Sequence, residues 1–264
     1  MSSCCKVPKT ESLWSQSCRI REREALPGNL ETEIAVIGAG MAGVLIADAL
    51  REAGCRVVVL EARRIASGQT RNTTAKITSQ HGLIYARMKK TLGAEKARQY
   101  AMANEAAIAA YRRIVSERGI DCELEKRDAF VYGCDAAALE AEAEAAASLG
   151  LPAGFTRDIT ISLSVAGAVR FTGQAQFHPL KFLRAMAEEL TIYENTPVLR
   201  VEDDRIITER GSVRAASIVF ASHYPFVNFP GMYFARMHQE RSYVLALENA
   251  AQVDGMWIGA APNS

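Results

Sequence analysis

A strand, a glycine-rich turn, a helix, a second strand and an acidic residue follow one another near the start of the chain. Residues 34–37 are an apolar run rich in β-branched side chains, and residues 38–43 read Gly-Ala-Gly-Met-Ala-Gly. A helical pattern of apolar residues then runs to Gly54, and the apolar run 57–60 ends in Glu61. This order within about 30 residues is that of a βαβ unit that binds a dinucleotide. It predicts an α/β fold with a Rossmann-like, FAD/NAD(P)-binding sheet.

The three glycines of the turn have separate physical roles. Gly38 permits a tight turn, Gly40 lets a pyrophosphate approach the backbone, and Gly43 allows the helix to pack closely on the sheet. The free N–H groups and the positive dipole at the start of the helix favour a diphosphate. The predicted cofactor-binding residues here are Gly38, Ala39, Gly40, Met41, Ala42, Gly43, Glu61 and Ala62. A glycine-rich turn that binds nothing is the alternative.

The acidic residue narrows the choice of dinucleotide. Glu61 lies 18 residues after Gly43, at the end of the second predicted strand. A carboxylate there accepts hydrogen bonds from the adenosine ribose and repels a 2′-phosphate, which argues against an NADP-type ligand.

Composition excludes several classes of protein. The chain has 264 residues, of which 49% are hydrophobic and 23% charged, and its net charge is +1. We therefore expect a globular protein without a nucleic-acid partner. No apolar stretch reaches the roughly 18 residues of a membrane span, and we expect no signal peptide. The six cysteines form no C-x-x-C pair and have no histidine at ligand spacing, so we expect no metal site and reduced thiols in the cytoplasm. The role of Cys4, Cys5 and Cys18 stays open.

The remaining elements are predicted from periodicity and from cap signals. Residues 1–30 are expected to pack loosely or to be disordered, with Trp14 as a possible anchor, and 62–85 to form a long irregular segment. The alanine- and glutamate-rich helix after the cap Asp135 is expected to present its glutamates to solvent. The other expected helices are 93–118 and 179–190, and the expected strands lie at 120–133, 168–171, 191–201, 205–208, 213–214, 218–222 and 241–247.

The stretch from Glu33 to Glu61 resembles the FAD-binding signature of the D-amino-acid oxidase / glycine oxidase-like family. Further segments that match this family lie at 63–76, 80–83, 177–181 and 221–231. The last of them is similar to a subgroup of bacterial FAD-dependent oxidoreductases that often carry a C-terminal Rieske-type iron–sulfur domain. The resemblance implies FAD as cofactor and a second, antiparallel-sheet (α+β) substrate domain. It also implies oxidation of a C–N bond in an amine or amino acid by hydride transfer to flavin N5.

The resemblance extends the list of candidate cofactor-binding residues. In the family, an arginine-containing, glycine- and threonine-rich segment runs under the flavin, a valine clamps the adenine, and small residues adjoin the diphosphate. The matching positions are Arg63, Gly68, Thr70, Thr73, Thr74, Ala75, Lys76, Val198, Ala221 and Ser222. Lys76 could stabilise the reduced flavin, and a surface lysine is the equal alternative. No catalytic residue is identified.

The resemblance also divides the chain. It implies an extension at 1–30, a discontinuous FAD-binding domain at 31–90 and 191–225, and a partial substrate domain at 91–190 and 226–264. Family members continue well beyond residue 264, so we expect the N-terminal part of a larger flavoprotein that binds FAD weakly or not at all by itself. Expected partners are a small amine or amino-acid substrate and an electron-transfer partner or Rieske domain outside this chain. The substrate, the electron acceptor and the oligomeric state stay open.

Two other functions remain compatible with the sequence. An NAD-binding dehydrogenase would use the same βαβ unit, although the segment 68–76 argues against it. A non-catalytic fragment that retains only the ADP-binding half is the second alternative.

Overall fold

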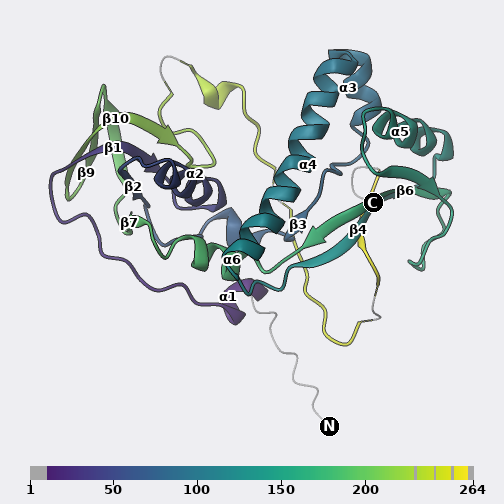
Figure 1. Cartoon of the computed structure of the whole chain (residues 1–264), viewed down its shortest axis with the longest axis horizontal. Coiled ribbons are helices and arrows are strands. Elements are labelled where there is room, and N and C mark those ends of the chain that lie inside the picture. Colours follow the sequence, from purple (N-terminus) through teal and green to yellow (C-terminus); the bar gives the residue numbers. More distant parts are fainter. Residues whose placement is uncertain (1–10, 229–230, 241, 251–252, 261–264) are drawn as a thin grey trace, which may run out of the picture. The chain divides into compact units, whose positions relative to one another are not determined.

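A computed structural model of the chain describes residues 11–228, 231–240, 242–250 and 253–260, and it contains two compact units. Unit 1 comprises Met1–Thr74 and Pro179–Ala246, and unit 2 comprises Ala75–His178 and Leu247–Ser264 (Figure 1). These boundaries differ from the expected ranges, since 75–90 falls in unit 2 and both 179–190 and 226–246 fall in unit 1. The chain enters unit 2 at residue 75 because Lys76 and Ile77 already pair with a strand of that unit.

Unit 1 is built on a six-stranded sheet. Its strands are β1 (Leu30–Ile37), β2 (Val57–Leu60), β7 (Thr191–Tyr193), β8 (Val198–Glu202), β9 (Arg205–Thr208) and β10 (Gly211–Phe220), in the order β7-β2-β1-β10-β9-β8. β7, β2, β1 and β10 are parallel, whereas β9 and β8 add an antiparallel edge. β1 begins before the apolar run because Leu30 to Thr32 pair with β10. The parallel α/β sheet expected from the sequence is confirmed.

Helices cover this sheet and connect its strands. They are α1 (Leu13–Ser17), α2 (Met41–Glu52), α6 (Pro179–Met186) and the 3-10 turns η1 (Gln69–Asn72) and η2 (Tyr233–Ala235). α2 packs on β1, β2 and α6 through a face that includes the buried Val44 and Ala47. α6 stops at Met186, four residues before its expected end.

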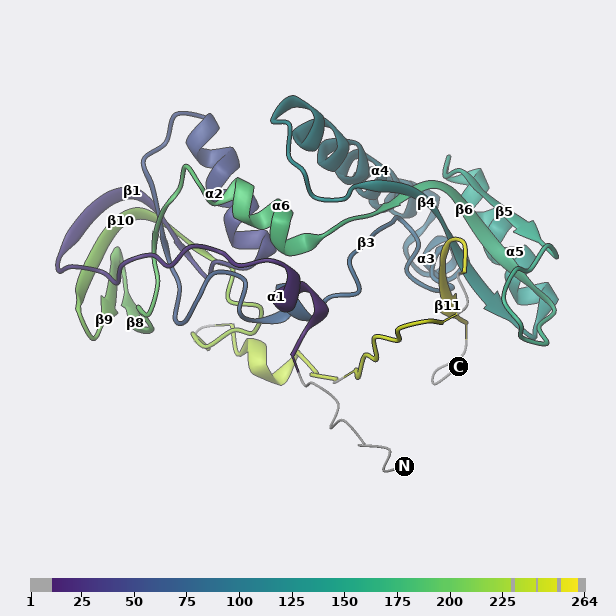
Figure 2. The same cartoon turned by 90° about the horizontal axis from the view of Figure 1, so that it is seen from below.

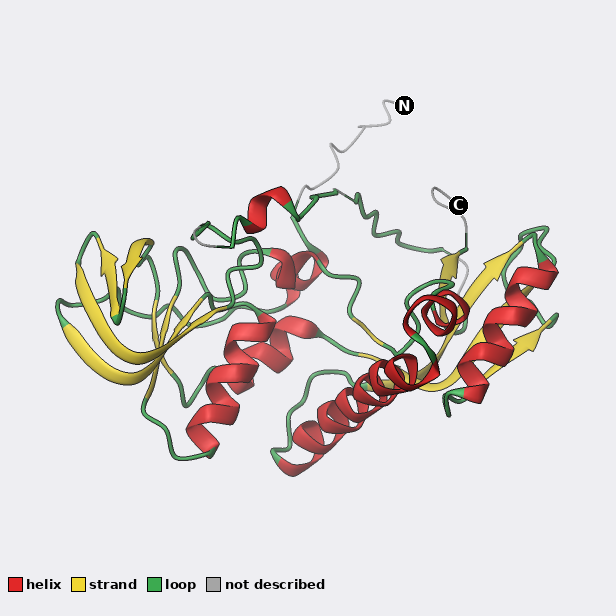
Figure 3. Ribbon diagram, turned by 90° about the horizontal axis from the view of Figure 1, so that it is seen from above, coloured by secondary structure: helices red, strands yellow, loops and turns green. Residues whose placement is uncertain are grey.

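Unit 2 contains a mixed five-stranded sheet. Its strands are β3 (Lys76–Ile77), β4 (Glu125–Gly133), β5 (Ala153–Thr156), β6 (Gly167–Gln176) and β11 (Met256–Gly259), ordered β11-β4-β6-β3 with β5 also on β6. β3, β4, β5 and β6 pair antiparallel, as the expected antiparallel-sheet domain requires, and β11 adds a strand parallel to β4. The helices are α3 (Tyr85–Leu92), α4 (Ala94–Glu117) and α5 (Ala136–Ser148), and Figure 3 shows α5 against the strands.

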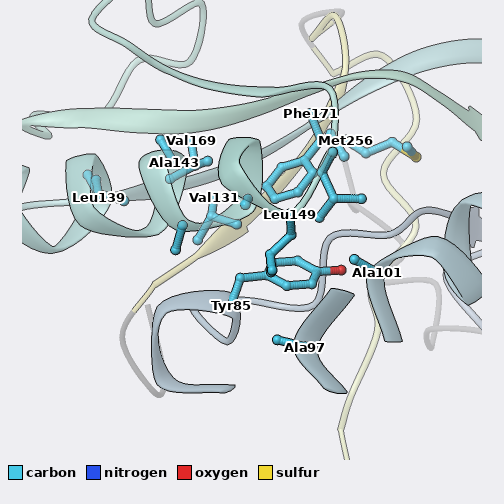
Figure 4. Packing of buried hydrophobic residues seen from close by; sticks show 14 residues of the cluster. Tyr85, Ala97, Ala101, Val131, Leu139, Ala143, Leu149, Val169, Phe171 and Met256 are labelled. Carbon is cyan, nitrogen blue, oxygen red and sulfur yellow. The ribbon is translucent and has the colours of Figure 1, made fainter. Parts of the chain in front are cut away.

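The core of unit 2 is filled by large side chains. Tyr85 and Phe171 are fully buried, with ring centroids 6.2 Å apart, and Leu139, Leu149 and Met256 pack around them (Figure 4). Together these side chains join α3, α5, β6 and β11 into one hydrophobic cluster.

Three further expectations are corrected. Residues 11–29, the described part of the segment before β1, do not pack loosely, because they are hydrogen-bonded to the rest of unit 1. Glu142 on α5 is buried rather than solvated, because its carboxylate accepts three backbone N–H groups. Residues 242–247 form no strand, and Tyr243 is 87% exposed. Residue 241 lies outside the described residues, as do Cys4 and Cys5, whereas Cys18 is a buried free thiol.

Candidate dinucleotide-binding site

The glycine turn after β1 requires glycine at two positions. Gly38 has a φ of +110°, and a Cβ there would lie 2.6 Å from the carbonyl oxygen of Ala221. A Cβ on Gly43 would lie 1.9 Å from the carbonyl oxygen of Gly38. Either substitution would push the backbone apart where β1, α2 and the end of β10 meet. Both predicted glycine roles, the tight turn and the close helix packing, agree with this geometry.

Gly40, the remaining glycine of the turn, leaves open space at the N-terminus of α2. Gly40 is the N-cap of α2 and makes no side-chain cap hydrogen bond, and the first turn carries no acidic residue. A Cβ on Gly40 would meet one atom within 4 Å, Thr70 Oγ1, at 3.4 Å. The N–H of Met41 donates to that same hydroxyl oxygen over 3.0 Å. The Thr70 oxygen thus marks an acceptor position at the positive end of the α2 dipole, and a phosphate oxygen fits that position.

Glu61 is held by the backbone on both sides of its carboxylate. Its Oε2 accepts the N–H of Ala39 over 2.8 Å, and its Oε1 accepts the N–H of Arg63 over 2.9 Å. Each oxygen of an ionised carboxylate has a further lone pair. The side chain is therefore fixed beside the glycine turn and can still accept ribose hydroxyl groups. These features together fit a dinucleotide.

Backbone hydrogen bonds link the segments that carry several other predicted site residues of unit 1. Asn195 N donates to Arg63 O over 2.8 Å, and Thr196 N donates to Glu61 O over 2.9 Å. These bonds tie the chain just before Val198, the first residue of β8, to the segment after β2. Ala221 and Ser222 follow β10, and Ala221 N donates to Ile37 O at the end of β1. The predicted residues Ala62, Gly68, Thr73 and Thr74 are exposed, and their role as ligands stays a prediction.

Ala75 and Lys76 belong to unit 2. Ala75 is buried with a φ of +60°, and Lys76 opens β3. The ammonium group of Lys76 donates to the carbonyl oxygen of Trp257 over 3.2 Å. Burial lowers the pKa of Lys76 because it disfavours the charged form. Lys76 is therefore a partly desolvated cation rather than a freely solvated surface lysine.

The structure adds one residue that the sequence reading missed. Glu194 is completely buried, and its carboxylate accepts the N–H of Ile65 over 2.7 Å and the N–H of Arg23 over 3.0 Å. Arg64 Nε lies 2.7 Å from the same carboxylate. Burial lowers the pKa of Arg64, but hydrogen bonds and charge from Glu194 and Glu22 outweigh burial and raise it. The available signal was a lone acid directly after a short apolar strand, just before the predicted adenine clamp.

Among the described residues, no group of three or more histidine, cysteine, aspartate or glutamate side chains could hold a metal ion. Within the same residues, no helix combines the length and the apolar character that a membrane crossing needs.

Comparison with known proteins agrees with this site. The family model described as "FAD dependent oxidoreductase" (DAO) matches residues 33–262. The chain belongs to this family. Its members are FAD-dependent by description, which favours FAD over NAD as the dinucleotide of the glycine turn.

A curated relative from Bacillus subtilis (strain 168) is 36% identical over 261 residues, covering 94% of this chain and 51% of the relative. It is named "Putative Rieske 2Fe-2S iron-sulfur protein YhfW". The chain thus spans about half the length of this relative.

Solved structures share the fold at low sequence identity. Glycine oxidase from Geobacillus kaustophilus aligns with a TM-score of 0.57 at 19% identity, over 73% of this chain and 55% of that one. L-Proline dehydrogenase from P. horikoshii aligns at 0.59 and 21%, over 75% and 54%. L-Amino acid deaminase from Proteus myxofaciens, in complex with anthranilate, aligns at 0.61 and 18%, over 77% and 48%.

Proposed function

We propose that this chain supplies the FAD-binding unit and part of the substrate unit of an oxidoreductase that oxidises a C–N bond in an amine or amino acid. The observation that carries the proposal is the fixed geometry of Gly38, Gly40, Gly43 and Glu61 in a chain of the DAO family. In this assignment unit 1 binds the cofactor and unit 2 carries part of the substrate site.

The residues of unit 1 bind and orient the cofactor. The N-terminus of α2 holds the diphosphate, with Gly40 allowing close approach, and Glu61 accepts the ribose hydroxyl groups. Val198 contacts the adenine, and Ala221 and Ser222 leave room beside the diphosphate. When bound, FAD accepts a hydride from the substrate carbon, and the protein supplies position and electrostatics.

In unit 2, Lys76 is the candidate cation for the flavin. When protonated, its partly buried ammonium group would stabilise added negative charge on the reduced ring and thereby raise the reduction potential. Burial lowers the pKa of Lys76, so this side chain releases a proton more readily than a solvated lysine.

The proposed substrate class is supported by the names of the solved structures, which refer to glycine, L-proline and L-amino acids. The relative with a Rieske name supports a one-electron acceptor of the iron–sulfur type. Two electrons from the substrate would then leave in two successive steps.

The test is anaerobic reduction of the FAD-loaded chain by a panel of amino acids and amines. The proposal expects loss of the flavin absorbance near about 450 nm with at least one of these compounds. Reoxidation should be faster with ferricyanide, a one-electron acceptor, than with oxygen. Bound flavin that no compound of either class reduces would overturn the substrate assignment and leave the cofactor assignment standing.

A further inference from the structure

The polypeptide before β1 makes a series of hydrogen bonds with the segment that follows β2. We call residues 12–26 the N-terminal strap and residues 61–73 the acid segment. Figure 2 shows the strap as the purple stretch that leads from α1 to β1. The strap precedes residues 33–262, the part of the chain that the family model matches.

The first part of the strap contacts the far end of the acid segment. The indole N–H of Trp14 donates to the carbonyl oxygen of Thr73 over 2.8 Å. The hydroxyl of Ser12 donates to the carbonyl oxygen of Arg71. Both acceptors are backbone atoms, so these contacts fix the path of the acid segment rather than one of its side chains.

The middle of the strap contacts Arg64. The guanidinium group forms an ion pair with Glu22 and donates to the carbonyl oxygen of Ile20 over 3.3 Å. Its opposite edge faces Glu194, so Arg64 bridges the strap and a buried carboxylate.

The end of the strap and the acid segment share Glu194. Its carboxylate accepts Arg23 N from the strap and Ile65 N from the acid segment, while Glu194 N donates to Glu24 O over 3.1 Å. Leu26 N donates to Thr196 Oγ1 over 3.0 Å. Breaking one of these hydrogen bonds leaves either the buried carboxylate or the N–H group without its partner. An unsatisfied buried charge or N–H group destabilises the fold.

The acid segment in turn contacts the glycine turn directly. Glu61 accepts Ala39 N, Thr70 accepts Met41 N, and Ala66 N donates to Ala39 O over 3.0 Å. Ala66 has a φ of +60°, a conformation that a non-glycine residue keeps only when its surroundings enforce it. Glu194 contributes to that enforcement, because its carboxylate accepts the N–H of Ile65, directly before Ala66. The strap contributes through Arg23, whose N–H donates to the same carboxylate.

We infer that the N-terminal strap is part of the dinucleotide site, with Trp14 and Glu194 as positioning residues that preorganise the acid segment for the ribose and diphosphate. This inference rests on the proposed FAD-binding function. Preorganisation raises affinity because the ordering of the acid segment is complete before the ligand binds. The two residues act through Glu61 and Thr70 and need no contact with the ligand themselves.

The test uses two matched pairs of variants in the whole chain. Trp14→Phe removes an indole N–H that donates to a backbone carbonyl, and Trp257→Phe removes the same kind of bond, to Asp254 O, in unit 2. Glu194→Gln alters a buried carboxylate that holds backbone N–H groups, and Glu142→Gln does the same in unit 2. Each protein is titrated with FAD and with ADP, and amide hydrogen exchange of 61–73 is measured with and without FAD.

The inference expects the dissociation constants for FAD and for ADP to rise about tenfold in Trp14→Phe and in Glu194→Gln, which corresponds to the loss of roughly one hydrogen bond. Exchange across 61–73 should rise in both variants, and saturating FAD should restore protection. The two control variants should bind both ligands as the unaltered chain does.

Unchanged affinity in Trp14→Phe and Glu194→Gln, or an equal loss in the controls, would overturn the inference alone. Failure of the unaltered chain to bind either ligand would overturn the proposed function, and with it the inference. Faster exchange across 61–73 without any change in affinity would assign the strap a purely structural role and also contradict the inference.

Discussion

Units 1 and 2 each contain a buried carboxylate that accepts backbone N–H groups. The carboxylate of unit 2 binds one helix N-terminus, whereas that of unit 1 links segments far apart in sequence. Glu142 in unit 2 accepts Ile84 N, Tyr85 N and Ala86 N, three successive donors at the start of α3. Glu194 in unit 1 instead joins donors from two segments far apart in sequence and an arginine. Glu142, on α5, thus caps the N-terminus of another helix, α3. Glu194 links separate segments and fixes the path of the acid segment.

The two units also differ in what fills them. Unit 2 is held by large side chains such as Tyr85 and Phe171. Unit 1 depends on close backbone approach at Gly38 and Gly43, beside a core cluster of aliphatic residues that includes Ile37 and Leu60. Unit 1 should therefore be sensitive to an added methyl group, and unit 2 to removed volume.

The largest effect is expected from emptying the core of unit 2. Phe171→Ala should lower the free energy of unfolding by about 4 kcal/mol, because the ring is fully buried and leaves a cavity. Urea denaturation measures this loss. Phe220→Ala, at a ring that is 46% exposed in unit 1, is the matched control and should cost well under half of that. Equal costs would show that burial of the Phe171 ring does not account for the loss.

An added methyl group should have the next largest effect, in unit 1. Gly43→Ala should cost about 3 kcal/mol, because the new Cβ would overlap the carbonyl oxygen of Gly38. Gly154→Ala on β5 meets nothing within 4 Å and should change stability by less than about 0.5 kcal/mol. Thermal unfolding of both variants checks this, and a tolerated Gly43→Ala would refute the close-packed turn.

The helix cap in unit 2 gives a smaller and more local effect. Glu142→Gln should cost about 2 kcal/mol, because an amide has one acceptor oxygen and the carboxylate uses two for its three donors. Amide exchange should quicken at the start of α3 and stay unchanged in the acid segment of unit 1. Quickened exchange in both places would contradict the separation drawn between the two carboxylates.

The smallest expected effect is a pH dependence of stability that arises from Lys76. Burial lowers the pKa of Lys76 below its ordinary value of 10.5, so this side chain should lose its proton earlier than a solvated lysine. The burial penalty on the charged form is fully present at neutral pH and is relieved as the pH rises from the folded pKa toward 10.5, so stability rises over that window. Carbon NMR of dimethylated lysines, with Lys76→Arg to assign the signal, measures this. A Lys76 signal that titrates at or above 10.5 would contradict it.

Local patterns predicted most of unit 1. The β1–α2–β2 unit and the position of Glu61 follow from period, glycine spacing and an acid at the end of a strand. The cap Asp135 also behaves as predicted, accepting Ala138 N over 3.1 Å. These features depend on residues close together in sequence.

The features that were missed depend on contacts between distant residues. β11 pairs in parallel with β4 across more than a hundred residues, and no local pattern encodes that partner. Glu142 looks like a solvated glutamate among its neighbours, since its burial is set by α3 rather than by α5 itself. The order of the N-terminal strap likewise depends on Glu194, about 170 residues further along the chain.

The central claim is that unit 1 binds FAD through the glycine turn, and a titration of FAD into the unaltered chain and into Gly40→Val tests it most directly. A Cβ at this position would touch nothing closer than Thr70 Oγ1 at 3.4 Å, and thermal unfolding of Gly40→Val checks that the two methyl groups beyond it leave the fold intact. The account predicts saturable FAD binding to the unaltered chain and a loss of at least about tenfold in Gly40→Val, whose side chain would occupy the approach to the backbone. Equal binding by both proteins, or binding by neither, would contradict it.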